Sequence, residues 1–504
     1  MLTRRRLLEA AWLMAAAASQ PAGASPRHFL HGVASGDPLA DRVILWTRVS
    51  GVDRVTEVAW ELARSPDFSA AVARGTTSAD PARDCTVKLD PGGLQPGQVY
   101  YYRFRVGDEL SPIGRTRTLP GADADGVRLA IVSCSNYPAG YFNVYRALGQ
   151  RHDLDAVLHL GDYIYEYAVD GYASERAAEF GRLSKPRGEL LTLADYRTRH
   201  AQYKTDPDLQ YVHGRLPFIV SWDDHEVANN SWTGGAQNHN PGEGAYAERV
   251  RNALTAYYEW MPIRENAERS REAAYRSFDF GGIATVAMIE TRLSGRSEPA
   301  SFQRDLPPRR TFFDAERPDQ AVTAPADGSG AGLLAVPGVF DLTTTPPTAV
   351  TDYRRLSRLN AADALPQGYG RLPDTERFER EVLSRPERQL LDTAQRRWLA
   401  ATLDDAARRG QAHRLIGNQT LMSPVRSADL TGVLSGERLA ALPEYLQALI
   451  PLTQYDLPAD LDNWDGYPAE RARVLELMRA SGGATVVTGD THNGWAAPLT
   501  DSAG

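Results

Sequence analysis

The sequence contains only two cysteines, Cys85 and Cys134, among its 504 residues. Two thiols form at most one bridge, so a disulfide scaffold is excluded as the basis of the fold. Long apolar runs are also missing, because the N-terminal stretch from Leu7 to Ala18 is too short and too rich in alanine to span a bilayer. A basic excess is absent as well, since the formal net charge is −8. A protein of this charge is a poor general binder of nucleic acids, and we expect no nucleic-acid partner.

Two further absences narrow the classes of function. No His-Glu-x-x-His motif occurs, so the sequence gives no sign of a zinc peptidase. No internal repeat is visible, and the length favours two domains over one hydrophobic core. Any phosphate site in such an acidic chain must obtain its positive charge locally, from a few arginines or from metal ions.

The N-terminus has the pattern of an export signal. Thr3-Arg4-Arg5-Arg6 places a twin arginine directly before the apolar stretch, and Ala22-Gly23-Ala24 supplies the small residues that a signal peptidase reads. We interpret residues 1–24 as a Tat-type signal, cleaved after Ala24, with a short membrane anchor as the alternative. This interpretation predicts contact with the Tat export machinery and a periplasmic or secreted protein.

Residues 25–122 read as an all-β domain. Short apolar strands are expected at 43–49, 58–62, 85–89 and 99–106, with Cys85 placed inside a strand. Turn signals separate these strands at short intervals, and Leu94-Gln95-Pro96-Gly97 resembles the corner of a fibronectin type III or immunoglobulin-like domain. The pattern therefore predicts an N-terminal β-sandwich with a structural role.

Residues 123–504 read as an α/β domain, because β-branched runs now alternate with helical stretches such as 389–407. Residues 293–372 differ, since they are rich in Pro, Gly, Thr and Asp and show little periodicity; we expect an insertion or a long lid-like loop. The chain stops soon after its last strand-loop motif, which suggests an incomplete C-terminus. The expected strands lie at residues 127–132, 156–160, 218–220, 283–289, 415–416 and 485–487.

Polar side chains follow the ends of these strands. Because ligands bind at the carboxyl ends of strands in open α/β sheets, these residues are expected to meet at one rim. Carboxylates gathered at one rim repel each other unless cations lie between them. The residues that follow the strands include Cys134, Asp162, Tyr165, Asp223, Asp224, His225, Asn418, Asp490 and His492.

The mixture of ligand types indicates which metals fit. Thiolate and phenolate from Cys134 and Tyr165 point to iron, whereas the oxygen-rich remainder, with Asp224 and the Asn418 side chain, suits calcium or magnesium. Asp223 fits equally well as a ligand or as an acid behind the ligands. Arg292, which follows the strand at 283–289, is a candidate clamp for a phosphate group.

At this point a family resemblance is visible. Gly161-Asp162-x-x-Tyr165, Asp224-His225-Glu226 and Gly489-Asp490-x-His492 resemble the ordered blocks of the calcineurin-like metallophosphoesterases, which include the purple acid phosphatases. The longer segments around these blocks, together with residues 31–38, look like the PhoD subgroup specifically. These segments are Ser-Cys-Ser at 133–135, Gly-Asp-Tyr-Ile-Tyr-Glu at 161–166, Trp-Asp-Asp-His-Glu at 222–226 and Gly-Asp-Thr-His-Asn at 489–493. The resemblance covers nearly the whole mature chain and predicts a four-layer α/β/β/α sandwich after the β-sandwich.

The resemblance implies an alkaline phosphatase or phosphodiesterase that hydrolyses phosphate monoesters and diesters by attack of metal-bound hydroxide. It implies an Fe³⁺ and Ca²⁺ centre, with Mg²⁺, Mn²⁺ or Zn²⁺ as substitutes. Cys134, Asp162 and Tyr165 would bind iron, joined by Asp490 and His492, although the resemblance leaves open which of these two binds which ion. Asp162 would bridge to the second metal, and Asp224 would bind that metal. His225 would donate a hydrogen bond to the phosphoryl group or leaving oxygen, and Arg292 would assist. We expect a monomer.

Three alternatives stay open. A phospholipase D-like activity on phospholipids would use the same site. A metallohydrolase acting on amide or glycosidic bonds would need another constellation, such as a carboxylate pair that the sequence alone does not exclude. A non-enzymatic surface protein would use the β-sandwich and leave the strand-end residues without a purpose.

Overall fold

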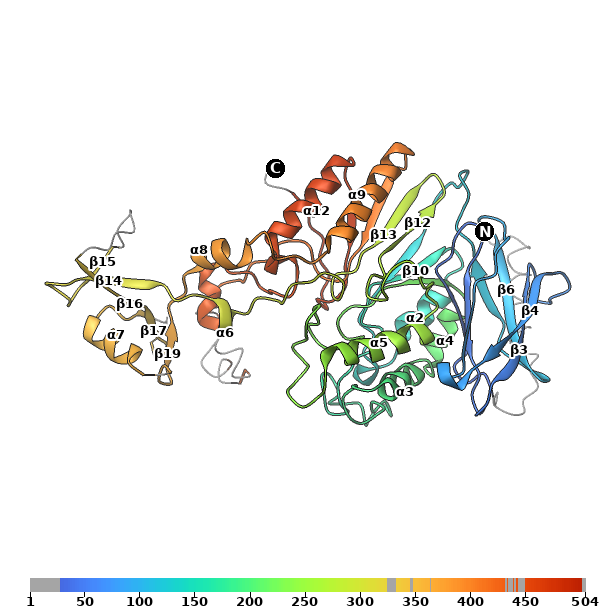
Figure 1. Cartoon of the computed structure of the whole chain (residues 1–504), viewed down its shortest axis with the longest axis horizontal. Coiled ribbons are helices and arrows are strands. Elements are labelled where there is room, and N and C mark those ends of the chain that lie inside the picture. Colours follow the sequence, from blue (N-terminus) through green and yellow to red (C-terminus); the bar gives the residue numbers. More distant parts are fainter. Residues whose placement is uncertain are drawn as a thin grey trace.

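The structure is a computed structural model that describes residues 28–500, apart from 324–331, 345–347, 363, 431–432, 434–437, 439–440 and 443–448. The export signal expected at residues 1–24 lies outside the described residues. A β-sandwich stands at one end, an α/β core lies in the middle and a narrow arm projects from the other end (Figure 1). Among the described helices, none combines the length and apolarity needed to cross a membrane.

The β-sandwich is confirmed. One of its sheets has the order β4-β3-β6-β7, with β8 paired to β6. Along β6 every second side chain is buried, so Tyr100, Tyr102 and Phe104 face the sandwich core. The strands of this sheet are β3 (Thr56–Ala63), β4 (Ala71–Ala79), β6 (Val99–Val106), β7 (Glu109–Leu110) and β8 (Gly114–Arg117).

Cys85 is a correction to the expected strand. It lies just before β5 (Thr86–Leu89), in a left-handed conformation with φ 57°. Its N–H donates to the carbonyl of Asp80 at 2.8 Å across a short 3₁₀ turn, whereas its carbonyl accepts from the N–H of Val49 at 3.0 Å. The side chain is still buried in the sandwich core.

The second sheet of the sandwich continues into the α/β core, which the sequence did not suggest. Its order is β5-β2-β1-β11-β10-β9, and β1 runs parallel to β11 with Gly36 beside Phe218. A Cβ on Gly36 would lie 2.2 Å from the carbonyl oxygen of Pro262, so only glycine permits this approach. The remaining strands are β1 (Val33–Gly36), β2 (Ile44–Arg48), β9 (Leu129–Val132), β10 (Ala156–His159) and β11 (Pro217–Val220).

A four-stranded sheet, β12-β13-β20-β21, forms the other half of the core. Leu158 and Ile219 from the six-stranded sheet share one buried cluster with Phe278 and Val286 from this sheet, so the two sheets pack face to face. Its strands are β12 (Arg276–Phe280), β13 (Ala284–Met288), β20 (His413–Gly417) and β21 (Thr485–Val487).

Helices cover the outer faces of both sheets, which completes the expected four layers. The helix predicted at 389–407 begins at Thr393, because the Asp392 side chain accepts from the N–H of Gln395 at 2.7 Å and caps it. One outer layer contains α2 (Asn143–Gly149), α3 (Leu193–Tyr203), α4 (Pro207–His213) and α5 (Tyr246–Trp260), and the other contains α9 (Thr393–Arg408) and α12 (Pro468–Ala480).

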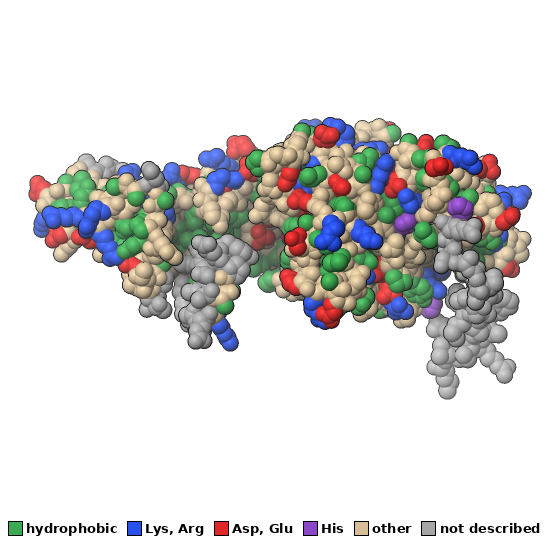
Figure 2. Space-filling model, turned by 90° about the horizontal axis from the view of Figure 1, so that it is seen from below, with side chains coloured by type: hydrophobic (Ala, Val, Ile, Leu, Met, Phe, Trp, Pro, Cys, Tyr) green, Lys and Arg blue, Asp and Glu red, His purple; other side chains and the backbone are tan. Residues whose placement is uncertain are grey.

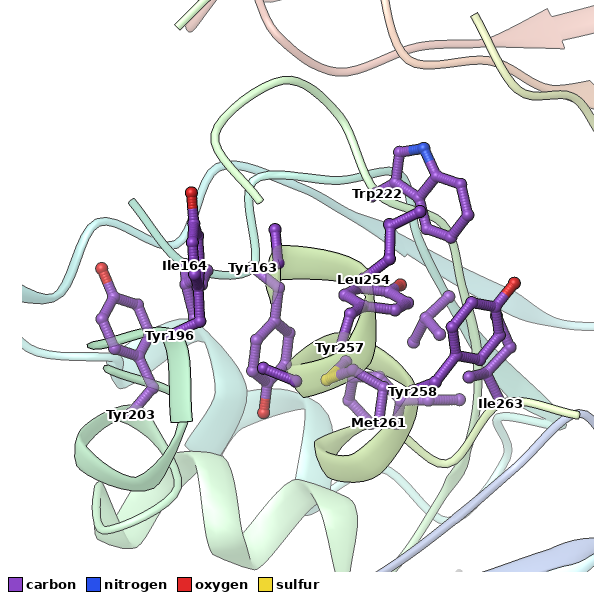
Figure 3. Packing of buried hydrophobic residues seen from close by; sticks show 14 of the residues in the cluster. Tyr163, Ile164, Tyr196, Tyr203, Trp222, Leu254, Tyr257, Tyr258, Met261 and Ile263 are labelled. Carbon is purple, nitrogen blue, oxygen red and sulfur yellow. The ribbon is translucent and has the colours of Figure 1, made fainter. Parts of the chain in front are cut away.

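The loops that leave β10 and β11 are anchored by aromatic side chains. Tyr163 and Trp222 are fully buried in the cluster that includes Leu254 and Tyr257 of α5 (Figure 3). Trp222 and Tyr257 meet edge to face with ring centroids 5.4 Å apart. These anchors fix the neighbouring residues Asp162 and Asp223 at the rim of the sheet.

The expected insertion is a folded arm rather than a loop. It holds two three-stranded sheets and has its own buried cluster of Phe313, Val339, Val350 and Leu356. The strands are only two to five residues long, too short to show periodicity. The arm contains β14 (Arg310–Asp314), β15 (Ala321–Val322), β16 (Leu333–Pro337), β17 (Val339–Asp341), β18 (Thr348–Ala349), β19 (Tyr369–Arg371), α6 (Phe302–Asp305) and α7 (Tyr353–Asn360).

The arm joins the core through two adjacent chain segments. The N–H of Asp374 donates to the carbonyl of Pro307 at 2.9 Å, and that of Arg309 donates to Leu372 at 2.7 Å. The face of the molecule in Figure 2 shows acidic and basic side chains interspersed over arm and core. Short helical segments complete the fold at α8 (Thr375–Phe378), Pro81–Arg83, Tyr137–Ala139, Glu379–Leu383, Ile450–Tyr455 and Trp464–Gly466.

Candidate metal centre

Four carboxylates meet at the rim formed by the strand ends. One oxygen from each of Asp162, Asp223, Asp224 and Asp490 lies within 4.8 Å of the other three. Asp162 follows β10, Asp223 and Asp224 follow β11, and Asp490 follows β21. The residues come from three separate parts of the chain, so the tertiary fold alone brings them together.

Asp162 also belongs to a second group, on the side of Cys134 and His492. The Cys134 Sγ lies 3.5 Å from Asp162 Oδ2, and Tyr165 Oη lies 3.3 Å from the same oxygen. Tyr165 Oη is also 3.2 Å from Nε2 of His492. Asp162 therefore occupies the position between the thiol and phenol group and the carboxylate group, as a bridging ligand would.

The backbone at this rim is strained at the predicted ligands. Cys134, Asp162, Asp490 and His492 all have positive φ, between 53° and 67°. Non-glycine residues rarely adopt this conformation, and it costs free energy that the surrounding structure must offset. Such residues cluster at functional sites, where the turn directs a side chain that a relaxed backbone would turn away.

Close packing and a buried acid hold the rim in this shape. Gly161 has φ 111°, and a Cβ there would lie 2.4 Å from the backbone nitrogen of Asp223. Glu226 accepts the N–H groups of Asp162, Tyr163 and Asp223 at 3.0, 2.5 and 2.8 Å. One carboxylate thus ties the loop after β10 to the loop after β11.

Several carboxyl groups are buried close together at the rim, and this crowding raises the pKa of three of them. Burial, together with Asp223 and Asp224, raises the pKa of Asp162 well above its usual value, although His225 opposes the shift. Burial and the neighbouring carboxylates likewise raise the pKa of Asp490, and the pKa of Asp223 rises to about 6. A cation between these oxygens would remove the repulsion.

A second observation also indicates that these residues bind a metal. Oδ1 of Asp162 and Oδ1 of Asp224 are buried and have no hydrogen-bond partner among the described residues. Buried acceptors are ordinarily satisfied, and metal coordination is one way to satisfy them. Cys134 gives a separate argument, because burial and Asp162 raise the pKa of its thiol, and a thiolate there needs a bound cation.

Arg292 lies inside the cluster rather than over it. Its guanidinium is fully buried and pairs with Asp223 through Nε and with Asp462 through Nη1, the latter at 2.5 Å. Nη2 lies 3.4 Å from both Asp224 and Asp490. Arg292 and His225 outweigh the effect of burial on Asp224 and lower its pKa to about 2. In this arrangement the arginine neutralises ligands, and its predicted contact with a phosphate stays a prediction.

His225 is oriented by a buried acid. Its Nδ1 lies 2.7 Å from Glu166 Oε2, and its ring packs on Tyr165 with centroids 4.3 Å apart. Burial lowers the pKa of His225, but Asp224, Glu166 and Asp162 outweigh burial and raise it well above the usual value. Since Glu166 holds Nδ1, Nε2 is left for a ligand near Asp162 and Asp224.

Asn418 has other partners. Its Nδ2 donates to the carbonyl of Thr420 at 2.5 Å, and its Oδ1 accepts from Trp464 Nε1 at 3.3 Å. Both ends of the amide are therefore engaged behind the rim, and its role as a ligand stays a prediction.

The sequence interpretation assigned no role to three acids that contact the rim residues. Glu166 and Glu226 stood inside recognised strings, next to Tyr165 and His225, so their position was a usable signal. Asp462, which pairs with Arg292 and also with Arg296 at 2.5 Å, follows no predicted strand and gave no signal.

Comparisons with known proteins agree with this geometry. The family model described as PhoD-like phosphatase matches residues 129–503, and the model of its N-terminal domain matches residues 15–120. Alkaline phosphatase D of Bacillus subtilis (strain 168) is 32% identical over 489 residues, which cover 94% of this chain. The chain spans 65% of that relative's length.

A solved structure, described as the structure of PhoD, superposes on this chain with a TM-score of 0.65 at 29% sequence identity. The match covers 93% of this chain and 73% of that one. The family models together extend over both the β-sandwich and the α/β core, in the order that the sequence predicted. The chain belongs to the PhoD-like phosphatase family.

Proposed function

We propose that this protein is a metal-dependent phosphoesterase that hydrolyses phosphate monoesters and diesters. The observation that carries the proposal is the rim itself, where four carboxylates, a thiol and an imidazole converge in a chain of the PhoD-like phosphatase family. The relative named alkaline phosphatase D, which this chain covers over 65% of its length, supports the same reaction class.

We assign Fe³⁺ to the side formed by Cys134, Tyr165 and His492, and Ca²⁺ to the side formed by Asp224 and Asp490, with Asp162 shared. Thiolate and phenolate favour ferric iron, and carboxylates favour calcium, with Mg²⁺, Mn²⁺ or Zn²⁺ as substitutes. When bound, such ions activate a water molecule and offset charge on the phosphoryl oxygens.

The protein's own residues position and protonate the substrate. Glu166 fixes the imidazole of His225, and Nε2 donates a proton to the leaving oxygen. Arg292 holds Asp223 and Asp224 in place as a buried counter-charge. Glu226 keeps the loops after β10 and β11 at one spacing, so that the carboxylates do not have to reorganise during the reaction.

We further propose that the chain is exported by the Tat machinery and acts as a monomer in the periplasm or outside the cell. The twin arginine at Arg5 and Arg6 supports this proposal. Replacement of Arg4, Arg5 and Arg6 with lysine should retain the unprocessed protein in the cytoplasm, as fractionation and the mass of the N-terminus would reveal. Undiminished export of that variant would overturn the Tat assignment.

The decisive test of function uses bis(p-nitrophenyl) phosphate and p-nitrophenyl phosphate with the protein from Ser25 onward. We expect release of p-nitrophenol in the presence of calcium and its loss on chelation. Asp162→Asn should abolish release, whereas Asp170→Asn, at an exposed position of the same loop region, should not. A protein with bound metal that hydrolyses neither ester would refute the proposal.

A further inference from the structure

A cavity of about 540 Å³ lies between the metal centre and the base of the arm. Its walls come from four parts of the chain: the segment after β11, the segment that contains α6, Leu449, and residues 459–462. In Figure 1, α6 stands where the arm meets the core. The lining includes Asn230, Trp232, Phe302, Asp460, Leu461 and Asp462.

The cavity adjoins the metal centre, because two of its wall residues contact the cluster directly. The N–H of Asn230 donates to Asp224 Oδ2 at 2.5 Å, and Asn230 itself has φ 53°. Another wall residue, Asp462, has its Oδ2 2.5 Å from Arg292 Nη1. The cavity is therefore separated from the rim carboxylates by no more than these wall side chains.

The apolar part of the lining is centred on Trp232. Its backbone pairs with Gly235, and a Cβ on Gly235 would lie 2.5 Å from Cζ2 of the indole, so the ring is packed flat against the turn. Phe302 and Leu461 add further apolar surface. A ring held this rigidly loses little conformational entropy when a ligand packs on it.

The charged part of the lining disfavours anions. Arg304 is the cation among the described lining residues, and it is paired with Glu298 and, at 2.8 Å, with Asp305. Asp462 is neutralised by Arg292 and Arg296, whereas within the described part of the chain the Asp460 carboxylate is bound only to the N–H of Asp462, at 2.9 Å. The cavity therefore carries an unbalanced negative charge.

The other side of the centre has a second cavity, of about 550 Å³, lined by Cys134, Tyr165 and Tyr172. His225, the proposed proton donor to the leaving oxygen, packs on Tyr165 of this second cavity, so the proposal below places the leaving group on this side. The first cavity, called the Trp232 cavity below, then lies on the side of the alcohol group that stays bound to phosphorus.

We propose that the Trp232 cavity binds the retained alcohol group of a phosphodiester and selects uncharged alcohols with an apolar or aromatic face. This proposal rests on the proposed phosphoesterase function. Trp232 and Phe302 supply the contact surface, and Asp460 repels a retained group that carries negative charge.

The test compares methyl p-nitrophenyl phosphate with phenyl p-nitrophenyl phosphate, which share a leaving group. In the wild type we expect kcat/KM to favour the phenyl ester about tenfold, the scale of burying one such ring. Trp232→Ala should bring the ratio close to one, whereas Thr233→Ala, in the same turn and exposed, should keep it. A Tm and a metal content like those of the wild type establish that the Trp232→Ala variant is folded.

A ratio near one in the wild type, or a ratio that folded Trp232→Ala preserves, would overturn the proposal. Absence of nitrophenol release from both esters would instead refute the proposed function.

A second experiment tests the selection against negative charge. 4-Carboxyphenyl p-nitrophenyl phosphate should have a lower kcat/KM than the phenyl ester, and Asp460→Asn should reduce this difference in kcat/KM. Equal rates for these two esters in the wild type would overturn the selection for uncharged groups.

Discussion

At the scale of single residues, one feature of the rim explains most of the others. Too many acids are buried together, so each is either paired with Arg292, held by backbone N–H groups, or left with an unsatisfied oxygen. Carboxylates left in this state are costly unless a cation joins them. The strained backbone at Asp162 and Asp490 is a further cost that packing offsets.

The two cysteines give a matched pair for testing the ligand assignment. Cys134→Ser should lower the affinity for iron about tenfold or more and reduce activity, because a hydroxyl is a poor substitute for a thiolate. Cys85→Ser, in the core of the β-sandwich, should reduce stability but leave the iron content intact. Iron analysis of both purified variants checks this, and equal iron contents would contradict the role of Cys134.

The pKa shifts predict how the metal-free protein responds to pH. The pKa is about 6 for Asp223 and about 8 for Glu226, both above the values of unfolded chains. At these two groups the folded state therefore binds more protons than the unfolded state between about pH 4 and pH 8, and their contribution to stability falls as pH rises through these pKa values.

Thermal melting of the chelated protein between about pH 5 and pH 8 checks this response. Burial lowers the pKa of His31, His159, His200 and His213, so these histidines oppose the buried acids and the test compares two variants. Glu226→Gln removes an acid with a raised pKa, so its Tm relative to that of the wild type should rise between about pH 5 and pH 8. We expect added calcium and iron to stabilise the wild type more at the upper end of this range, because they bind charged carboxylates. A Tm difference between Glu226→Gln and the wild type that does not change with pH would contradict the raised pKa of Glu226.

At the scale of elements, the notable feature is that β1 belongs to two structures. One of its faces packs into the β-sandwich through Val33, and Ala34 on the other face packs with Trp46 against Trp260 of the catalytic core. Just after β1, Asp37 pairs with Arg276 at 2.7 Å. The N-terminal strands thus extend the sheet that carries most of the proposed metal ligands.

This shared strand predicts a sensitive glycine. Gly36→Ala should lower the free energy of unfolding by about 1–3 kcal/mol, because the added methyl group meets the backbone oxygens of Pro262 and Phe218 and cannot be accommodated by a side-chain movement. Gly126→Ala, where nothing lies within 4 Å, is the control and should be close to neutral. Denaturant unfolding of both variants measures the difference; similar midpoints would argue against tight packing at β1.

At the scale of the whole molecule, the arm is a separate structure attached to the catalytic core. It has its own hydrophobic cluster, and its two ends lie together where Arg309 bonds to Leu372. The described contacts of the metal ligands come from the core, not from the arm sheets. The arm is therefore free to vary without altering the chemistry at the rim.

Removal of the arm tests this independence. Replacement of residues 309–372 by a short glycine linker should leave a folded protein, because both ends of the deleted segment already lie side by side. We expect hydrolysis of p-nitrophenyl phosphate to stay within about threefold of the wild type, with bound metal unchanged. Loss of metal from the folded deletion variant would show that the arm supports the centre.

The sequence by itself determined the order of the two folds and most of the candidate site. The apolar run at 99–106 located the strand β6, and the apolar run before Asp162 located the strand that presents it. Strand-end residues are local features, since the strand and its following turn are contiguous in the chain. Local patterns therefore carried the prediction of Cys134 and Asp490 at one rim.

Only the tertiary structure decided what these residues contact. The burial of Arg292 among carboxylates, the pairing of Asp462 with it and the parallel union of β1 with β11 all join positions distant in the chain. No periodicity encodes such contacts, because each depends on how separate layers pack. The fold of the arm was likewise decided only by tertiary contacts. Its strands are too short to show a sequence period, and they are stabilised by pairing with each other.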